Sequence, residues 1–236
     1  MRRVALGVFL LGCAKPAPSS APAVPPIASP APSQPAPLDP RVRTDLAALG
    51  YFPEEPAPAR EKCAGAADGR ELVGRTLPEW SLGGWVGGAP GSLAALRGRV
   101  VVVRFWTAGC PYCERTLPAL QRLADELAGK PVTFVGAFHA KPVAAFADLA
   151  EPGKLAARWG VKFALGLDPD WRTLRAWWLE TGHRHASSVT FVIGPDGRVV
   201  HVHPGPVFYP SAAPADDRPN ADYLALRAAV LGALPR

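Results

Sequence analysis

The stretch Arg99-Val-Val-Val-Val-Arg-Phe-Trp-Thr-Ala-Gly-Cys-Pro-Tyr-Cys-Glu-Arg-Thr-Leu-Pro118 decides the fold. Residues 100–105 are β-branched, charged or aromatic in a short run that predicts a strand buried on both faces. Leucines then recur at helical spacing, at Leu117, Leu120, Leu123 and Leu127. We therefore expect a strand, a tight turn that Gly109 permits, and a helix that residues 110–113 open.

The spacing of the two cysteines suits reversible disulfide chemistry. Two cysteines three positions apart at a helix start lie one turn from each other, so their sulfurs can form a disulfide with modest strain. The unpaired N–H groups of the first turn stabilise a thiolate, which is the reactive form of cysteine. Pro111 fits an early helical position, because the N–H that proline lacks would be unpaired there. The motif predicts a redox-active pair of Cys110 and Cys113.

Two other uses of a Cys-x-x-Cys motif stay open. The motif forms half of many zinc sites, but the sequence has no second copy of it, and the pairs His183/His185 and His201/His203 are distant along the chain. A purely structural disulfide would close a very short loop and would stabilise the fold little. Thiol–disulfide exchange is the favoured interpretation.

Further segments accompany the motif in a fixed order. They are Leu72-Val-Gly-Arg-Thr-Leu-Pro-Glu-Trp-Ser-Leu82, Ser92-Leu-Ala-Ala-Leu-Arg-Gly-Arg-Val100, Phe105-Trp106 ahead of Cys110, and Pro118 after Cys113. In this combination residues 71–205 resemble the TlpA-like thiol–disulfide oxidoreductases, from the AhpC/TSA–redoxin group of the thioredoxin superfamily. The resemblance implies that Cys110 attacks a substrate disulfide and Cys113 resolves the mixed disulfide. It also implies that Trp106 shields the thiols and that Pro111-Tyr112 helps to set the redox potential.

The composition describes a basic chain with a proline-rich start. Of the 236 residues 28 are prolines, concentrated in the N-terminal quarter, and the formal net charge is +6. Lysines and arginines are scattered rather than clustered, so a solvated basic surface explains the charge better than a nucleic-acid site does. We expect no nucleic-acid partner.

The first residues have the features of a bacterial lipoprotein leader. Arg2 and Arg3 precede a short apolar run, and Leu10-Leu11-Gly12-Cys13 is similar to a lipobox, whose cysteine is acylated. We expect residues 1–12 to be a signal peptide and Cys13 to carry the lipid. An ordinary secretory signal or a mis-assigned start codon is the alternative. The apolar run is far shorter than a membrane span needs.

Residues 13–40 are nearly all Ala, Pro and Ser, which predicts a disordered tether between the lipid and a working domain. Residues 41–70 are predicted to be an N-terminal extension, with a short helix over residues 39–51. Cys63 follows in a segment rich in Gly and Ala. It can be a free thiol, a partner in an intermolecular bridge, or a resolving cysteine for Cys110.

Residues 71–236 are predicted to form the folded domain. Strands are expected over residues 132–138 and 163–167, and helices over residues 143–160, 171–180 and 220–233. Strand, helix and strand in succession imply a parallel pair with a right-handed crossover. A turn signal over residues 194–197 predicts a hairpin between residues 188–193 and 198–203.

Two of these helices carry detailed expectations. Pro152-Gly153 is expected to break the helix over residues 143–160. The last helix is expected to pack through Tyr223, Leu224, Leu226, Val230 and Leu231.

The chain departs from the family pattern at three positions. The family usually places a cis-proline facing the cysteines, and here Ser188 or Val189 aligns with it, so a trans bond is expected. Arg104 stands where thioredoxin has a buried acid; near Cys110 it would favour the thiolate, but it can also extend outward to solvent. Thr116 stands where the family often has glutamate, which removes a candidate proton acceptor.

Histidines at alternate positions raise a copper or zinc hypothesis, because alternate residues of a strand share one face. His201 and His203 satisfy this geometry if the strand extends that far. Exposed histidines on hairpins are common, so we expect no metal cofactor and keep these two as weak candidates. A copper-binding chaperone without catalysis is one alternative function.

A thiol peroxidase is the other alternative. Thr107-x-x-Cys110 resembles the peroxiredoxin Thr-x-x-Cys motif. The proline expected four residues before that threonine is absent, however, and Val103 stands in its place.

Together these observations predict an α/β thioredoxin-like three-layer fold, a central mixed β-sheet flanked by helices, with a disordered N-terminal extension. The predicted function is exchange of disulfides with protein substrates through a redox-active Cys110–Cys113 disulfide, without a cofactor. The resemblance implies a reductase supplied by a membrane or periplasmic electron donor. We expect a monomer that a lipid anchors to a bacterial membrane, facing the periplasm.

Overall fold

The computed structural model describes residues 68–141, 146–182, 184 and 186–235. All of them belong to the unit Pro37–Arg236. The predicted leader and tether, the expected helix over residues 39–51, Cys63, His183 and His185 lie outside the described residues, as do residues 142–145 of the expected helix 143–160.

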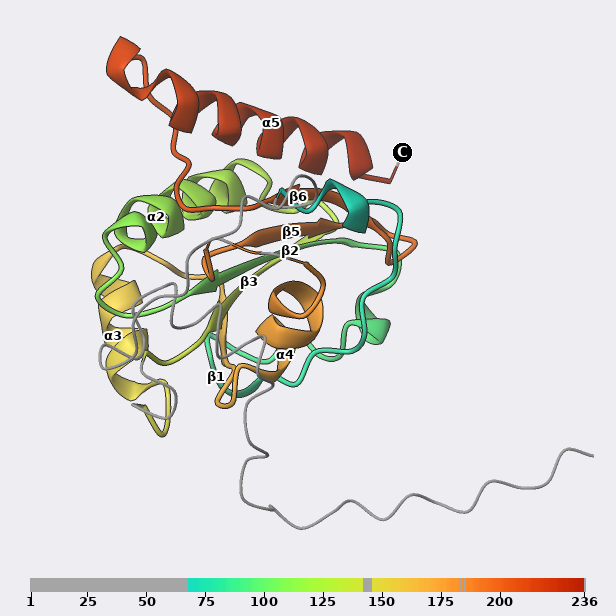
Figure 1. The fold of residues 1–236 in the computed structure, drawn as a ribbon, viewed down its shortest axis with the longest axis vertical. Coiled ribbons are helices and arrows are strands. Elements are labelled where there is room, and N and C mark those ends of the chain that lie inside the picture. Colours follow the sequence, from blue (N-terminus) through green and yellow to red (C-terminus); the bar gives the residue numbers. More distant parts are fainter. Residues whose placement is uncertain (1–67, 142–145, 183, 185, 236) are drawn as a thin grey trace, which may run out of the picture. The chain divides into compact units, whose positions relative to one another are not determined.

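The described residues form one mixed sheet of six strands in the order β1-β4-β3-β2-β5-β6 (Figure 1). The strands are β1 (Gly83–Val86), β2 (Val100–Trp106), β3 (Val132–Phe138), β4 (Ala164–Leu167), β5 (Thr190–Ile193) and β6 (Val199–His203). β3 pairs parallel with both β2 and β4, which confirms the predicted parallel pair. β5 is antiparallel to β2 and to β6, so the predicted hairpin is present, and β1 is antiparallel to β4.

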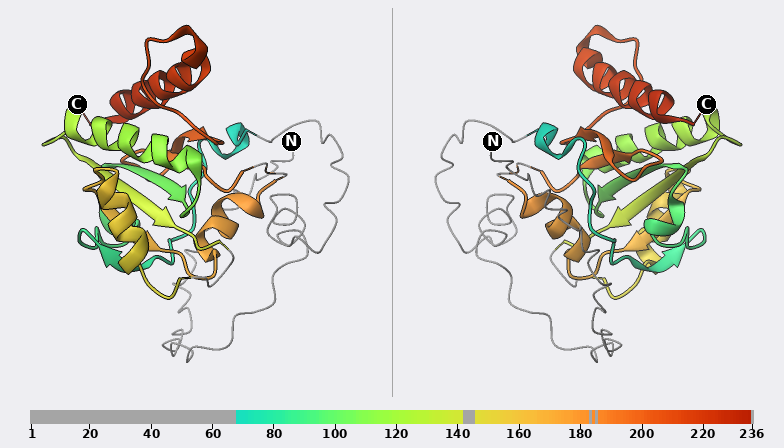
Figure 2. Two further views of the ribbon diagram at one scale, coloured as in Figure 1. Left: turned by 90° about the vertical axis from the view of Figure 1, so that its left-hand side faces the viewer. Right: turned by 90° about the vertical axis from the view of Figure 1, so that its right-hand side faces the viewer.

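Helices cover both faces of this sheet, as Figures 1 and 2 show. The α-helices are α2 (Pro111–Glu126), α3 (Ala150–Arg158), α4 (Arg172–Leu174) and α5 (Asp217–Ala233). The π-helix η3 (Arg175–Leu179) continues α4, and single turns of 3-10 helix are η1 (Arg70–Leu72), η2 (Ala94–Leu96) and η4 (Pro214–Asp216). The predicted fold class, a mixed sheet between helical layers, is confirmed.

Successive residues of β2 serve opposite faces of the sheet, as the alternation of a strand requires. Val101, Val103 and Phe105 pack with the tryptophans of the α4–η3 segment. Val100 and Val102 face the other way and pack with α2 and α5. All seven residues of β2 are buried, so the predicted central strand is confirmed, and Arg104 lies on the face that α2 and α5 cover.

The expected break at Pro152-Gly153 was wrong. Both residues lie inside α3, where the Gly153 N–H donates to the Leu149 carbonyl at 2.7 Å. Pro152 falls in the first turn, where backbone N–H groups have no partner within the helix, so the N–H that proline lacks costs nothing there.

Two further details differ from expectation. Leu224 and Leu231 do not pack in the core: they are exposed, whereas Tyr223, Leu226 and Val230 of the same helix are buried. The strand β1 was not predicted, because its two leading glycines give no strand signal. It forms through a close approach, since a Cβ at Gly166 of β4 would lie only 2.8 Å from the Trp85 ring of β1.

The two faces of α5 supply a matched test of this packing. Leu226→Ala should lower the free energy of unfolding by about 2–5 kcal/mol, because the fully buried side chain leaves a cavity between α5 and the sheet. Leu224→Ala, on the exposed face of the same helix, should change it by about 0.5 kcal/mol or less. Chemical denaturation measures both, and equal losses would contradict the orientation of α5.

Candidate active site

Cys110 begins helix α2 directly after the turn that leaves β2. Its backbone is extended (φ −89°, ψ 109°), and its Sγ accepts a hydrogen bond from the Cys113 N–H at 3.3 Å. Pro111 occupies the first helical position, where the N–H that proline lacks would be unpaired. The helix start therefore supplies a donor to this sulfur, as the sequence predicted.

The two sulfurs form a close pair with different access to solvent. Cys113 is buried and Cys110 is partly exposed, and their Sγ atoms lie 2.7 Å apart. This separation exceeds a disulfide bond of about 2.05 Å, so both are thiols, with Cys113 donating to Cys110. An accessible sulfur above a buried one is the arrangement that stepwise disulfide exchange requires.

The surroundings of this pair shift the pKa values of the two thiols in opposite directions. The pKa of Cys110 is lowered to about 6, chiefly by the hydrogen bond from the Cys113 thiol, although burial opposes this shift. The Cys113 N–H, the Ser188 hydroxyl and the charge of Arg104 lower it further. The pKa of Cys113 is raised well above its ordinary value, first by its hydrogen bond to Cys110 and then by burial. Cys110 is therefore the thiolate at neutral pH and Cys113 the thiol.

The aromatic neighbours take different positions around the pair. Trp106 is fully buried in one cluster with Cys113, and its ring meets Phe138 edge-on at 4.9 Å. Tyr112 is 48% exposed and lies beside Cys110 at the surface. The Thr116 hydroxyl donates to the Tyr112 carbonyl at 2.8 Å and so serves the helix backbone.

The loop before β5 brings Ser188 to the sulfurs. The Ser188 Oγ lies 3.5 Å from the Sγ of Cys113 and 3.9 Å from that of Cys110. Val189 instead packs in the opposite core, and its carbonyl accepts from the Phe105 N–H at 2.9 Å. Ser188 is therefore the residue that faces the cysteines. The cis peptide bond found in the described residues joins Gly205 to Pro206, which agrees with the trans bond expected in the Ser188 loop.

Arg104 is fully buried beneath the sulfurs, so its extension to solvent, the alternative, was wrong. Its Nη1 donates to the Ser188 carbonyl at 2.6 Å and to the Thr190 Oγ1 at 3.2 Å. Its Nη2 donates to the Pro206 carbonyl at 2.7 Å. One guanidinium thus holds both the Ser188 loop and the loop that follows β6.

His139 is a buried residue of the site that the sequence analysis missed. It follows the end of β3, and its Nε2 lies 3.0 Å from the Ser187 Oγ, while the described residues offer its Nδ1 no partner. Burial, together with the charge of Arg104, lowers its pKa to about 3, so the imidazole is neutral. Its place after a parallel strand next to β2 was the available signal, because the carboxyl ends of such strands share one edge.

A hollow of about 550 Å³ opens beside Cys110, and we call it the cysteine pocket. Its lining comes from segments far apart in the sequence: Asp68, Cys110, Tyr112, Lys141, Ala186, Ser187, Ser188, Pro204, Gly205, Pro206 and Arg218. Proline and tyrosine side chains make its wall largely apolar, and lysine and arginine place positive charge at its margin. The partly exposed sulfur is therefore reached through a groove large enough for a short piece of extended chain.

Comparison with known proteins identifies this arrangement. A family model described as "AhpC/TSA family" matches residues 73–202, which is more than half of the chain. The chain belongs to the AhpC/TSA family. The matched residues include Arg104, both cysteines and the Ser188 loop, but end before the loop of Gly205 and Pro206.

Curated relatives match this AhpC/TSA protein over a shorter stretch. The soluble secreted antigen MPT53 of Mycobacterium tuberculosis is 34% identical over 83 residues, which are 35% of this chain and 43% of the relative. The thioredoxin-like protein YneN of Bacillus subtilis is 36% identical over 80 residues, 32% of this chain and 46% of the relative. The matches therefore span less than half the length of these relatives.

A solved structure supports the fold independently. The thiol:disulfide interchange protein, thioredoxin family protein, from Chlorobium tepidum superposes with a TM-score of 0.51 at 23% identity. The superposition covers 73% of this chain and 100% of that one. The thioredoxin-like fold that the sequence predicted is confirmed.

Of the two histidines of β6, His203 is engaged by its neighbours, whereas the Nε2 of His201 has no hydrogen-bond partner among the described residues. The Gly205 N–H donates to the His203 Nδ1 at 3.2 Å, and the His203 Nε2 lies 3.4 Å from the Asp222 carboxylate. Burial, aided by the charge of Arg104, lowers the pKa of His203 to about 3, and burial also lowers that of His201. In the part of the chain that the structure describes, no group of three or more His, Cys, Asp or Glu is arranged to hold a metal ion.

The peroxidase alternative depends on Thr107, which is buried. Its hydroxyl finds no hydrogen-bond partner among the described residues, so it does not donate to Cys110. A Thr-x-x-Cys motif that served peroxide chemistry would need this hydroxyl at the sulfur. The geometry therefore favours disulfide exchange over the peroxidase reading.

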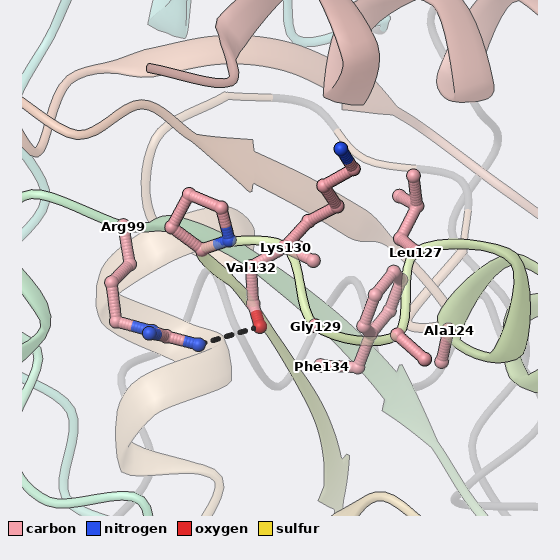
Figure 3. A pocket seen from close by; sticks show the side chains of 9 residues that line it. Arg99, Ala124, Leu127, Gly129, Lys130, Val132 and Phe134 are labelled. Carbon is pink, nitrogen blue, oxygen red and sulfur yellow. Dashed lines mark hydrogen bonds between the residues drawn. The ribbon is translucent and has the colours of Figure 1, made fainter. Parts of the chain in front are cut away.

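A second hollow, of about 490 Å³, lies at the opposite edge of the sheet (Figure 3). It is lined by residues at the amino ends of β2 and β3, among them Arg99, Lys130 and Phe134. The Arg99 guanidinium is engaged there, since its Nη2 donates to the Val132 carbonyl at 3.1 Å and its Nε to the Thr133 Oγ1 at 3.2 Å. A seven-residue strand of roughly 20 Å separates this hollow from the cysteines.

The lowered pKa of Cys110 predicts how the rate of its alkylation depends on pH. Alkylation of the reduced protein by iodoacetamide should rise with pH around a midpoint near 6, because only the thiolate reacts and the pKa of Cys110 is about 6. Ser188→Ala should move the midpoint upward by removing one donor, whereas Ser81→Ala, whose hydroxyl contacts neither sulfur, should leave it in place. A midpoint near the ordinary cysteine value of about 8.5 would contradict the geometry.

Proposed function

We propose that this protein is a thiol–disulfide oxidoreductase that exchanges disulfides with protein substrates through Cys110 and Cys113. The observation that carries the proposal is the sulfur pair itself: the partly exposed Cys110 Sγ stands at a helix start, 2.7 Å from the buried Cys113 Sγ. The thiol:disulfide interchange protein with the same fold supports the same chemistry.

In the reducing direction the reaction proceeds in two exchanges. The Cys110 thiolate attacks one sulfur of a substrate disulfide, forms a mixed disulfide and releases the other substrate sulfur as a thiolate. Cys113 then loses its proton and attacks Cys110, which closes the Cys110–Cys113 disulfide and releases the substrate as a dithiol. Two electrons pass from the protein to the substrate. The oxidising direction reverses both steps.

The raised pKa of Cys113 supports its assignment to the second step. Its hydrogen bond to Cys110 is the largest cause that raises its pKa, and the charge of Cys110 adds to it. Both causes end when Cys110 enters the mixed disulfide, while Arg104 continues to favour a thiolate at Cys113. Formation of the first bond thus activates the second nucleophile.

The cysteine pocket suits a polypeptide substrate. Tyr112, Pro204 and Pro206 offer apolar contact beside the sulfur, and Ser187 and Ser188 offer polar groups along one wall. A disulfide in an extended or partly unfolded segment could reach Cys110 through this groove. We propose a protein substrate on these grounds, with a membrane or periplasmic donor to restore the reduced pair. The reductase direction that the resemblance implies stays a prediction.

We further propose that the protein works outside the cytoplasm, held to a membrane through a lipid on Cys13. The lipobox-like Leu10-Leu11-Gly12-Cys13 supports the anchor, and the relative MPT53 is described as secreted. Among the described residues, no helix has the length and apolar character of a membrane span. We retain the expectation of a monomer.

Substitution of each cysteine tests the mechanism. Cys110→Ser should abolish exchange with a disulfide-bonded protein, since the attacking sulfur is gone. Cys113→Ser should accumulate a covalent mixed disulfide that non-reducing electrophoresis detects, because no second sulfur resolves it. Cys63→Ser should retain exchange, which separates this cysteine from the pair. Full activity of the Cys110 variant would refute the proposal.

The anchor has its own test. Full-length protein expressed in a bacterium that processes lipoproteins should sediment with membranes and carry a labelled fatty acid. Cys13→Ala should remove the label and release the protein from the membrane fraction, with exchange activity retained. Absence of label from the unmodified protein would refute lipidation without affecting the assignment of Cys110 and Cys113.

A further inference from the structure

Arg104 is a buried cation held by neutral groups. Its side chain is fully buried, and the three acceptors of its hydrogen bonds are the Ser188 carbonyl, the Thr190 hydroxyl and the Pro206 carbonyl. Its Nε has no partner among the described residues. No ion pair of the described residues includes this guanidinium, whose face lies 5.6 Å from the Phe208 ring centroid. Nothing in these contacts neutralises its charge.

A second buried arginine shows what a neutralised site looks like in this fold. The Arg184 side chain is also buried, but its guanidinium forms an ion pair with the Glu71 carboxylate and stacks on the Trp178 ring at 3.9 Å. An unpaired charge in a protein interior is strongly unfavourable, so a buried arginine normally has such a partner. Arg104 has no such carboxylate partner among the described residues, so its buried charge requires an anion from elsewhere in the site.

The groups around Arg104 leave one source for that anion. His139, which follows β3, and His203, at the end of β6, are close enough to feel its charge, and both are neutral because burial and the Arg104 charge oppose their protonation. Lys141 and Arg218 at the margin of the pocket add positive charge. The charges of Cys113 and Cys110 are the ones that favour the cationic form of Arg104 against its burial. A thiolate is thus its only available counter-ion among the described residues.

We propose that Arg104 is a positioning residue that sets the reduction potential, because its buried charge is neutralised only while the pair of Cys110 and Cys113 carries a thiolate. The proposal rests on the function proposed above. Its guanidinium stabilises the reduced pair relative to the disulfide and raises the potential. Arg104 therefore makes the protein a stronger oxidant than the same site with a neutral residue, an effect opposite to the one a reductase needs.

The electron and proton balance gives the sign. Two glutathione thiols reduce the Cys110–Cys113 disulfide: that S–S bond breaks and one S–S bond forms in glutathione disulfide. Of the two protons that the glutathione thiols lose, one goes to Cys113 and one to water, and Cys110 is released as a thiolate. The site around Arg104 carries an unpaired positive charge before this reaction and a neutral ion pair after it. Arg104 therefore favours the products, and its removal favours the disulfide.

Two variants, one neutral and one that keeps the positive charge, test the proposal by equilibration with glutathione. Arg104→Gln keeps an N–H donor for the Ser188 carbonyl but removes the charge, and it should shift the equilibrium about tenfold toward the disulfide, which corresponds to about 30 mV. Arg104→Lys keeps the charge and should retain most of the wild-type equilibrium. Arg184→Met, a buried arginine with its own carboxylate partner, should leave the equilibrium unchanged.

The free energies of unfolding of the oxidised and reduced forms distinguish loss of the Arg104 charge from loss of its hydrogen bonds. Loss of hydrogen bonds alone would destabilise the oxidised and reduced forms equally, whereas loss of the counter-ion should destabilise the reduced form more. If Arg104→Gln does not fold, Arg104→Met replaces it, since apolar residues often substitute well for buried charges. An unchanged glutathione equilibrium in the neutral variant, or equal losses in both redox forms, overturns the proposal. Neither result depends on a protein substrate, so failure of the proposed function would show separately, as absent exchange.

Discussion

The parallel pairing of β2 with β3 fixes where the chemistry of this protein can take place, because it brings the carboxyl ends of both strands to one edge of the sheet. Cys110 follows β2 and His139 follows β3. Since β5 runs antiparallel to β2, its amino end reaches the same edge and carries Ser188 with it. Three segments far apart in the chain therefore meet at one place, and the start of helix α2 adds the N–H that the sulfur needs.

Two of the three departures of this chain from the family pattern, Arg104 and Ser188, are in direct contact. A buried arginine in place of an acid would be costly on its own, but Ser188 supplies a carbonyl acceptor to it and a hydroxyl to both sulfurs. Thr190, opposite Arg104 in the β2–β5 ladder, supplies another acceptor. Arg104, Ser188 and Thr190 therefore belong to one hydrogen-bonded network that reaches both sulfurs.

The features that depend on neighbours in sequence could be predicted. The buried strand β2, the helix that begins at Cys110 and the β5–β6 hairpin each follow from local residue patterns. Arg104 could not be placed, because a strand pattern does not say which loops offer acceptors, and Ser188 could not be separated from Val189 before the register of β5 was known. Pro206 and His139 join the site only through tertiary contacts. The exposure of Leu224 likewise depends on how α5 lies over the sheet, which helical spacing alone does not determine.

The loop after β6 places part of the site beyond the residues that the family model matches. The family match ends at residue 202, yet Pro204, Gly205, Pro206 and Arg218 line the groove that leads to the sulfur. This loop is held from below by Arg104 and from the side by the ring nitrogen of His203. A change in this C-terminal segment can therefore reshape the groove without touching the cysteines or the strands that carry them.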